Sequence, residues 1–364
     1  MRSGMNSINK KLASLLIVTL SCLTGLVVIE IGLRFIHFDN PWQVNEEANI
    51  LRNFQFTYDV SKLYSSDSLN VKYMRNEYGL RDSCVSPDQI EILTIGGSTT
   101  DQRYVPLELT YQSRLQERLN DVDDGFGCVS NAGIDGHSTW GHLFAFENWF
   151  PLIPELRPKF ILLYVGINDA NFSRAHTPKV TYYQINKNTI KTFLKTFQLV
   201  KALLPIYRLV RQSSENLSTV YAGHNPRSYV RSDYKVTEMN EETIRLSTEN
   251  AEAFKSRMIG LLEQIRTLNA IPVCVTQPHR YVIEVNDQTY GIPNVLGEGL
   301  SGIDYDFSIR QLNAVMFELC GQNTLDLYSH SFLNSHFYDG AHTTPLGSQV
   351  IGERMADFFI EKFY

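Results

Sequence analysis

The sequence predicts an α/β fold, in which a parallel five-stranded sheet is covered by helices on both faces. Short apolar stretches alternate with longer stretches whose apolar residues recur every three or four positions, as strands alternate with helices in a doubly wound sheet. The third apolar stretch, residues 160–165, is apolar throughout, as expected of a parallel strand covered on both sides. The predicted strands are residues 92–95, 126–130, 160–165, 271–276 and 324–328.

Helices are predicted between these strands, with faces that can cover the sheet. In residues 106–120, Leu107, Tyr111, Leu115 and Leu119 recur every four positions and therefore share one helix face. The other predicted helices are residues 140–151, 241–268, 305–320 and 345–363.

Length and composition indicate one large domain with appendages. The chain has 364 residues, of which 43% are hydrophobic and 20% charged, and its formal net charge is -6. This composition supports a sizeable core and excludes an intrinsically disordered protein. The mild acidity, with no basic block near the motifs described below, argues against nucleic acid as a partner.

An apolar run near the N-terminus predicts a membrane anchor. Residues 12–29 form an uncharged run of 18 residues, which is the lower limit for crossing a bilayer. Arg2, Lys10 and Lys11 precede the run without any acidic residue, so residues 1–11 should be cytoplasmic and the single-pass anchor should occupy residues 12–36. The rest of the chain should then lie outside the cytoplasm, in a periplasm, lumen or extracellular space. A cleaved signal peptide is the alternative, although no A-x-A-like site follows Ile29.

Two further segments interrupt the regular pattern. Residues 37–75 show no sustained period, and we expect a stalk that joins the membrane to a domain at residues 76–364. An insertion at about residues 171–235 contains a predicted helix at 187–211, broken or kinked at Pro205. Between Ala170 and Ser214 there are eight lysines and arginines and no acidic residue. Such a basic segment can lie on an anionic membrane surface or simply face the solvent.

Four short motifs follow apolar stretches or lie near the C-terminus. The first predicted strand runs into Gly96 and Gly97, which lead to Ser98, and the carboxyl ends of parallel strands are where open α/β sheets place their active sites. The other motifs are NAGIDGHST (131–139), GINDA (166–170) and DGAHTT (339–344).

In this order the motifs resemble those of the SGNH, or GDSL-like, hydrolase family. That family carries a serine after a first strand, a glycine, an asparagine in a GxND turn, and a DxxH pair near the end. The resemblance runs from about Asn76 to the C-terminus, apart from the insertion, and implies a flavodoxin-like strand order. The sequence departs from the family at one point. The usual Gly-Asp-Ser is here Gly96-Gly97-Ser98, which removes a carboxylate beside the serine.

The resemblance implies a role for each motif residue. Ser98 would be the nucleophile, with Asp339 and His342 as its acid and base, since a serine hydroxyl needs a base that a third group orients. The oxyanion would be bound by the backbone amides of Ser98 and Gly136 and by the side chain of Asn168. No cofactor and no metal are expected for this chemistry.

The expected activity is that of a membrane-anchored serine esterase acting on O-acyl groups, in particular O-acetyl groups, of an exported carbohydrate or related ester. Alternatives are an O-acetyltransferase with the same triad, a lipid esterase or lysophospholipase, and a catalytically dead binding protein. His336, Asp339 and His342, spaced three residues apart, could instead bind a divalent metal.

Substrate contacts are expected from residues beside the predicted strand ends. Arg81 follows a turn at Gly79 upstream of the first strand, and Gln277 and His279 follow the fourth strand. A solvated surface arginine is the alternative for Arg81.

Four cysteines lie outside the predicted anchor, namely Cys84, Cys128, Cys274 and Cys320. An even number outside the cytoplasm permits two disulfides. Cys84 and Cys128 flank inner strands and are the preferred pair, whereas Cys274 lies in a predicted core strand and could equally be a buried thiol.

Overall fold

The computed structural model describes residues 2–34, 42, 45, 48–65, 70–171, 197–199, 203, 219–221, 229–239, 241–295 and 300–364. The chain divides into two compact units, residues 1–41 with 186–214 and residues 42–185 with 215–364. The insertion helix predicted at 187–211 lies almost entirely outside the described residues.

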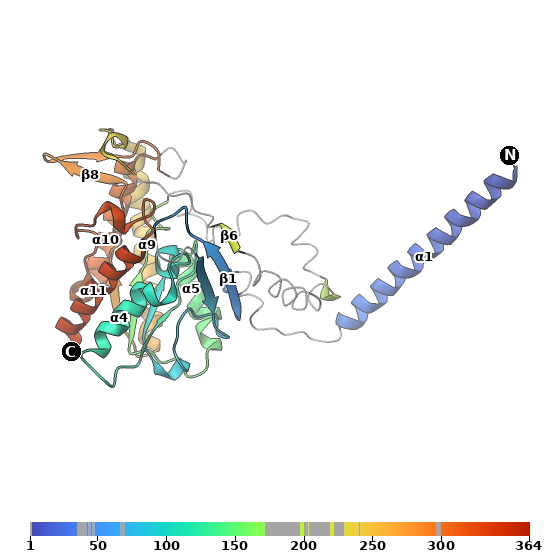
Figure 1. Cartoon of the computed structure of the whole chain (residues 1–364), viewed down its shortest axis with the longest axis horizontal. Coiled ribbons are helices and arrows are strands. Elements are labelled where there is room, and N and C mark those ends of the chain that lie inside the picture. The colour runs from blue at the N-terminus through green and yellow to red at the C-terminus, as the bar shows by residue number, and fades with distance from the viewer. Residues whose placement is uncertain are drawn as a thin grey trace. The chain divides into compact units, whose positions relative to one another are not determined.

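The first unit contains α1 (Arg2–Arg34), which is one uninterrupted helix (Figure 1). Its segment Leu16–Arg34 has a mean hydropathy of 2.3, and none of that segment is buried inside the protein. In the described part of the chain, this is the one helix long and apolar enough to cross a membrane, a property that signal sequences share. Towards the end of α1, Glu30 accepts hydrogen bonds from the backbone N–H groups of Gln198 and Leu199, both at 3.0 Å.

The second unit is built on a parallel five-stranded sheet with the strand order β10-β7-β5-β3-β4. In chain order this is the 2-1-3-4-5 arrangement of flavodoxin-like sheets, with β4 beside β3 at one edge. The doubly wound fold and all five predicted strands are therefore confirmed. The strands are β3 (Ile90–Gly96), β4 (Cys128–Asn131), β5 (Phe160–Tyr164), β7 (Ile271–Val275) and β10 (Thr324–Leu325).

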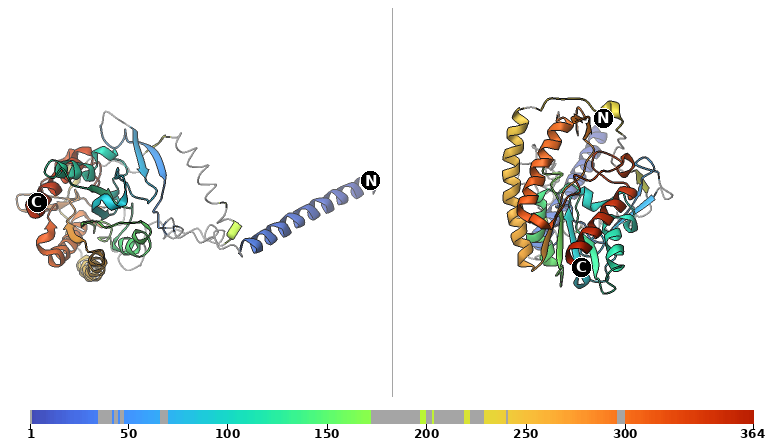
Figure 2. Two further views of the ribbon diagram at one scale, coloured as in Figure 1. Left: turned by 90° about the horizontal axis from the view of Figure 1, so that it is seen from below. Right: turned by 90° about the vertical axis from the view of Figure 1, so that its left-hand side faces the viewer.

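Helices cover both faces of this sheet, because alternate residues of the strands point to opposite sides. Along β5, Phe160, Leu162 and Tyr164 join the core beneath α4 and α11, while Ile161 and Leu163 join the core beneath α5, α9 and α10. The right-hand view of Figure 2 shows α9 and α10 on one side of the sheet and α11 on the other. The helices are α4 (Tyr111–Asn120), α5 (Thr139–Asn148), α9 (Glu241–Thr267), α10 (Gly302–Cys320) and α11 (Pro345–Phe363).

The expected stalk is wrong for part of its length, because two of its segments are strands of the second unit. β1 (Phe54–Asp59) pairs antiparallel with β2 (Asn70–Arg75) and parallel with β6 (Thr219–Tyr221), which comes from the insertion. In β2, Val71, Tyr73 and Arg75 are buried while the residues between them are exposed. This alternation lasts only six residues and ends on an arginine, so it is inconspicuous in the sequence.

A second hairpin was also not expected from the sequence. β8 (Val282–Val285) and β9 (Gln288–Gly291) pair antiparallel after β7, and β8 is labelled in Figure 1. The strands are short and contain both polar and apolar residues, so they lack the continuous apolar character that marks the central sheet.

Two disulfides join elements of the second unit. Cys84–Cys128 links the segment before β3 to the start of β4, which confirms the preferred pairing. Cys274–Cys320 links β7 to the end of α10 and decides between the two alternatives for Cys274. Cys22, in α1, is free and exposed.

Candidate active site

Ser98 lies at the point where β3 ends and a short helix begins. That helix, α3, spans Ser98–Asp101 and follows Gly97 directly. The residues around it are buried, whereas Ser98 is half-buried. The turn therefore raises one hydroxyl at the carboxyl end of the central sheet, as the first motif predicted.

His342 lies beside this hydroxyl. Its Nε2 is 2.7 Å from Ser98 Oγ, and its Nδ1 is 2.7 Å from Asp339 Oδ2. The other oxygen of Asp339, Oδ1, accepts the backbone N–H groups of Ala341 at 2.9 Å and His342 at 2.8 Å. The carboxylate is thus fixed by its own loop, and it can orient the imidazole so that Nε2 faces the serine.

The charges around His342 favour its protonated form. Burial disfavours the imidazolium, but the charge of Asp339, its hydrogen bond and the charge of Asp135 outweigh burial, so the pKa of His342 lies above its ordinary value. Tyr338 stacks on the imidazole with ring centroids 5.6 Å apart and an interplanar angle of 8°. This stacking and the Asp339 hydrogen bond together hold the ring in one orientation.

The two other motifs meet beside Ser98. Gly136, in the loop after β4, has a φ of +77°, a conformation that favours glycine. Asn168 follows β5, and its Nδ2 donates a hydrogen bond of 2.9 Å to the backbone carbonyl of His137. The same amide lies against Gly97, the residue before Ser98. Segments that follow β3, β4 and β5 therefore converge at one edge of the sheet.

This strand order, with all four motifs at one sheet edge, is the arrangement that the family resemblance implied. The second unit has the doubly wound, flavodoxin-like α/β fold that this resemblance implied.

Solved structures with similarity to this chain include hydrolases of several kinds. An acetyl xylan esterase is 12% identical with a TM-score of 0.38, and the match covers 74% of this chain and 98% of that one. A G-D-S-L family lipolytic protein from Desulfitobacterium hafniense is 12% identical with a TM-score of 0.38, covering 73% and 98%. A lipase from a goat rumen metagenome is 12% identical with a TM-score of 0.43, covering 74% and 97%. No family model and no curated protein sequence matches the chain.

The side chains of Arg81, Gln277 and His279, which were expected to contact substrate, instead contact other residues of the protein. Gln277 is 1% exposed; its Oε1 accepts Thr99 Oγ1 at 3.0 Å and its Nε2 donates to the Tyr164 carbonyl at 2.9 Å. It therefore ties the end of β7 to α3 and β5. The sequence placed it at the correct sheet edge, but the side chain turns inwards.

Arg81 and His279 differ from the expectation in the same way. Arg81 is 2% exposed and donates to the backbone carbonyls of residues 101, 102 and 105 at 2.6–2.8 Å. His279 accepts the Tyr281 N–H at Nδ1, 3.2 Å away, and its Nε2 is 3.2 Å from Asp306 Oδ1. Both side chains stabilise the protein around the site rather than offering a free group to a substrate.

A buried ion pair that the sequence did not reveal supports the serine turn. Asp101, three residues after Ser98, is fully buried and lies 2.7 Å from Arg75 Nη2. The same Nη2 donates to the carbonyl of Gly133, in the loop that leads to Gly136. Burial raises the pKa of Asp101, but the charges of Arg75, Arg103 and Arg81 outweigh it, so the pKa lies below its ordinary value. Arg75 therefore joins the serine turn to the loop after β4 that contains Gly136.

The GIND turn is held by a second buried ion pair. The carboxylate of Asp169, the residue after Asn168, accepts two hydrogen bonds from Thr139. One comes from the backbone N–H at 3.1 Å and the other from the side-chain hydroxyl, Oγ1, at 2.5 Å. Arg257, from α9, lies 3.4 Å from the Asp169 carboxylate and donates to Thr139 Oγ1 at 2.6 Å. These contacts hold the residue that directly follows Asn168.

The metal alternative involves residues that do not converge. His336 Nδ1 accepts the Leu333 N–H at 3.2 Å, while Asp339 faces His342. Among the described residues, no group of three His, Cys, Asp or Glu side chains could hold a metal ion.

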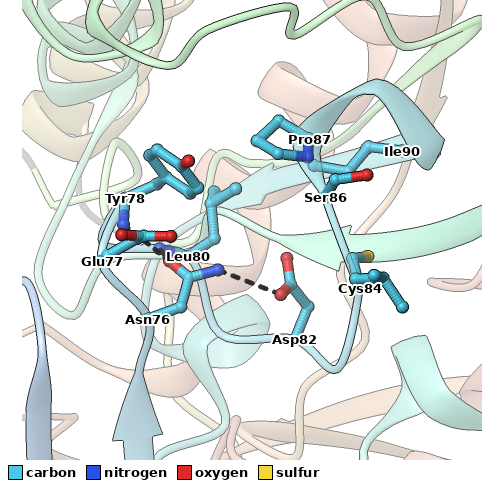
Figure 3. A pocket seen from close by; sticks show the side chains of 10 residues that line it. Asn76, Glu77, Tyr78, Leu80, Asp82, Cys84, Ser86, Pro87 and Ile90 are labelled. Atoms are coloured by element: carbon cyan, nitrogen blue, oxygen red, sulfur yellow. Dashed lines mark hydrogen bonds between the residues drawn. The ribbon is translucent and has the colours of Figure 1, made fainter.

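The pocket in Figure 3 lies at the start of β3, where Ile90 lines it. It has a volume of about 80 Å³ and is lined by residues that include Asp82, Cys84 and Ile90. Asn76 Nδ2 donates to Asp82 Oδ1 at 3.2 Å. Because Ile90 begins β3 and Ser98 follows its end, roughly 20 Å of strand separates this pocket from the candidate site.

Proposed function

We propose that this chain is a serine esterase that removes O-acyl groups, in particular O-acetyl groups, from an exported carbohydrate. The observation that carries the proposal is the continuous hydrogen-bonded series from Asp339 through His342 to Ser98, with both contacts at 2.7 Å. A serine hydroxyl in contact with an oriented imidazole is the arrangement that activates it for attack on a carbonyl carbon.

In the first half of the reaction, Ser98 Oγ attacks the ester carbonyl while His342 Nε2 takes its proton. The resulting imidazolium is stabilised by Asp339. It then gives the proton to the leaving alcohol oxygen as the ester C–O bond breaks, which leaves an acyl-serine. In the second half, His342 takes a proton from water as the water oxygen attacks the acyl carbon. The imidazolium then returns this proton to Ser98 Oγ as the bond between Oγ and the acyl carbon breaks, which releases the carboxylic acid and restores the serine hydroxyl.

The negative oxygen of each tetrahedral intermediate needs donors that are already in place. The backbone N–H groups of Ser98 and Gly136 and the side-chain amide of Asn168 are the proposed donors. Loss of one such donor costs about 3 kcal/mol of barrier in acyl transfer. Asn168 is suited to this role because its amide is held by the His137 carbonyl.

The location outside the cytoplasm is part of the proposal. We take α1 as a membrane anchor, with residues 1–11 cytoplasmic and the second unit on the other side. Two disulfides support this placement, because disulfides persist in oxidising compartments and are rare in the cytosol.

Two measurements test the proposal. A fluorophosphonate probe should label the purified protein, and Ser98→Ala should abolish both labelling and turnover of p-nitrophenyl acetate. Ser61→Ala changes an exposed serine away from the site and should leave both unchanged. A panel of p-nitrophenyl esters should show the highest kcat/KM with the shortest acyl chain. Turnover that survives Ser98→Ala contradicts the mechanism, and a preference for long chains contradicts the substrate class.

A further inference from the structure

We propose that Gly97 is a positioning residue of the oxyanion hole, because its missing side chain makes the space in which the Asn168 amide lies. This inference rests on the proposed function and deepens it. It assigns a purpose to the one position at which the serine motif departs from the Gly-Asp-Ser pattern.

The space over Gly97 is already filled. A Cβ built on Gly97 would lie 2.4 Å from Asn168 Nδ2 and 3.1 Å from the backbone oxygen of His137. Carbon and nitrogen atoms that are not bonded do not approach to 2.4 Å, so any side chain at residue 97 must displace Asn168 or the turn. The glycine is not required by a left-handed backbone, because its φ is -88°.

The position of Asn168 depends on two neighbours. On one side its Nδ2 donates to the His137 carbonyl at 2.9 Å, and on the other side it rests on the backbone of Gly97. An amide nitrogen carries two hydrogens, and in the described part of the chain the His137 carbonyl is the one partner of Asn168 Nδ2. The second hydrogen is therefore available to an oxyanion next to Ser98.

An aspartate at residue 97 would harm the site in two ways. Its Cβ would push the Asn168 amide away from the serine, and its carboxylate would place a negative charge close to the developing oxyanion. In this chain the side chain of Asn168 can therefore lie close to Ser98 only because residue 97 is a glycine. Restoring the more usual Gly-Asp-Ser motif should lower the activity rather than improve it.

A double-mutant cycle between Gly97 and Asn168 tests this contact. The variants are Gly97→Ala, Asn168→Ala and the double variant, with Gly97→Asp as a fourth protein. For each, the melting temperature is measured together with kcat and KM for p-nitrophenyl acetate. Gly125→Ala is the matched control, since the nearest atom to its added Cβ is the flexible Asp123 side chain at 3.3 Å.

Gly97→Ala should lower kcat by about 100-fold, as expected for a lost oxyanion donor, with a much smaller change in KM. It should also lower the melting temperature. In the Asn168→Ala background the same substitution should have little further effect on either quantity, because the truncated side chain no longer occupies the space. Gly97→Asp should be at least as impaired as Gly97→Ala, and Gly125→Ala should match the unchanged protein.

Additive effects in the cycle would overturn the proposal, and so would an active Gly97→Asp protein. If the melting temperatures show the coupling but the unchanged protein hydrolyses no ester, the contact is real and the catalytic role is wrong. That outcome would overturn both this proposal and the proposed function. If esterase activity is present and the coupling is absent, only the role of Gly97 fails.

Discussion

His342 lies within the field of two carboxylates, and both favour its protonated form. Asp339 is in direct contact at 2.7 Å, whereas Asp135 acts through its charge alone and helps to hold the pKa of His342 above its ordinary value. Only the neutral imidazole can accept the Ser98 proton. The pKa of His342 should therefore set the pH below which kcat/KM falls, which is the acid limb of its pH profile.

Replacing Asp135 with asparagine should therefore shift the acid limb to lower pH. The substitution removes one charge that stabilises the imidazolium. It also leaves Arg103, which lies 3.3 Å from Asp135, with only the Asp101 carboxylate at 3.4 Å of these two partners, so that less of its positive charge is neutralised and the remainder acts in the same direction. The pH dependence of p-nitrophenyl acetate hydrolysis measures the shift. Asp88→Asn, at the opposite end of β3, is the control, and an unchanged limb in Asp135→Asn would contradict this account.

Arg75 offers a test of the buried support beneath the serine turn. Arg75→Ala leaves the fully buried Asp101 without its closest cation, and breaking such a pair costs about 3–5 kcal/mol of folding free energy. Denaturant unfolding measures the loss. The control is Arg118→Ala, since Arg118 pairs with Asp121 at 3.8 Å with both side chains exposed, where about 0–1 kcal/mol is expected. Equal losses in the two variants would contradict the distinction.

At the scale of elements, the β1–β2 hairpin shows why a domain boundary is hard to place from sequence. Its inner face ends on Arg75, whose guanidinium reaches Asp101 across 26 positions of sequence. A charged residue in an inward position hides the apolar alternation, and no local pattern announces its distant partner. The sequence boundary at residue 76 therefore cuts between Arg75 and the site that it supports.

Two shortened chains should show whether the folded domain begins at residue 42, as in the structure, or at residue 76, as the sequence suggested. A chain beginning at residue 42 retains the second unit from its start and should unfold cooperatively. A chain beginning at residue 76 lacks β1, β2 and Arg75, so it should be unfolded or melt at a much lower temperature. Circular dichroism with thermal melting distinguishes them. Equal melting temperatures would restore the view that residues 37–75 are a spacer.

The helices and strands of the central sheet could be predicted because their patterns are local. Apolar runs mark the strands, and turn motifs after them mark the sheet edge where Ser98, Asn168 and His342 meet. The direction of a side chain beyond a strand end is not local. Gln277 and His279 were placed at the correct edge, yet both turn inwards to partners such as Tyr164 and Asp306, which no spacing in the sequence identifies.

At the scale of the whole molecule, the proposed anchor makes a prediction about topology. With residues 1–11 in the cytoplasm, a reporter that is active only outside the cytoplasm should work when fused after Tyr364, at the end of α11. A reporter active only in the cytoplasm should fail at the same point. Fusion to a chain without residues 1–34 is the control, since it should reverse both results. Cytoplasmic activity in the full chain would contradict the proposed orientation.

The chain order of the site also bears on when its chemistry becomes available. Ser98 and His342 are separated by 244 positions, and the Asp339–His342 pair directly precedes α11. If the chain is threaded through a translocation channel N-terminus first, its serine emerges long before the base that activates it. The hydroxyl then stays inert during transit, and the proposed hydrolysis can start only when Asp339 and His342 have emerged and folded against the serine.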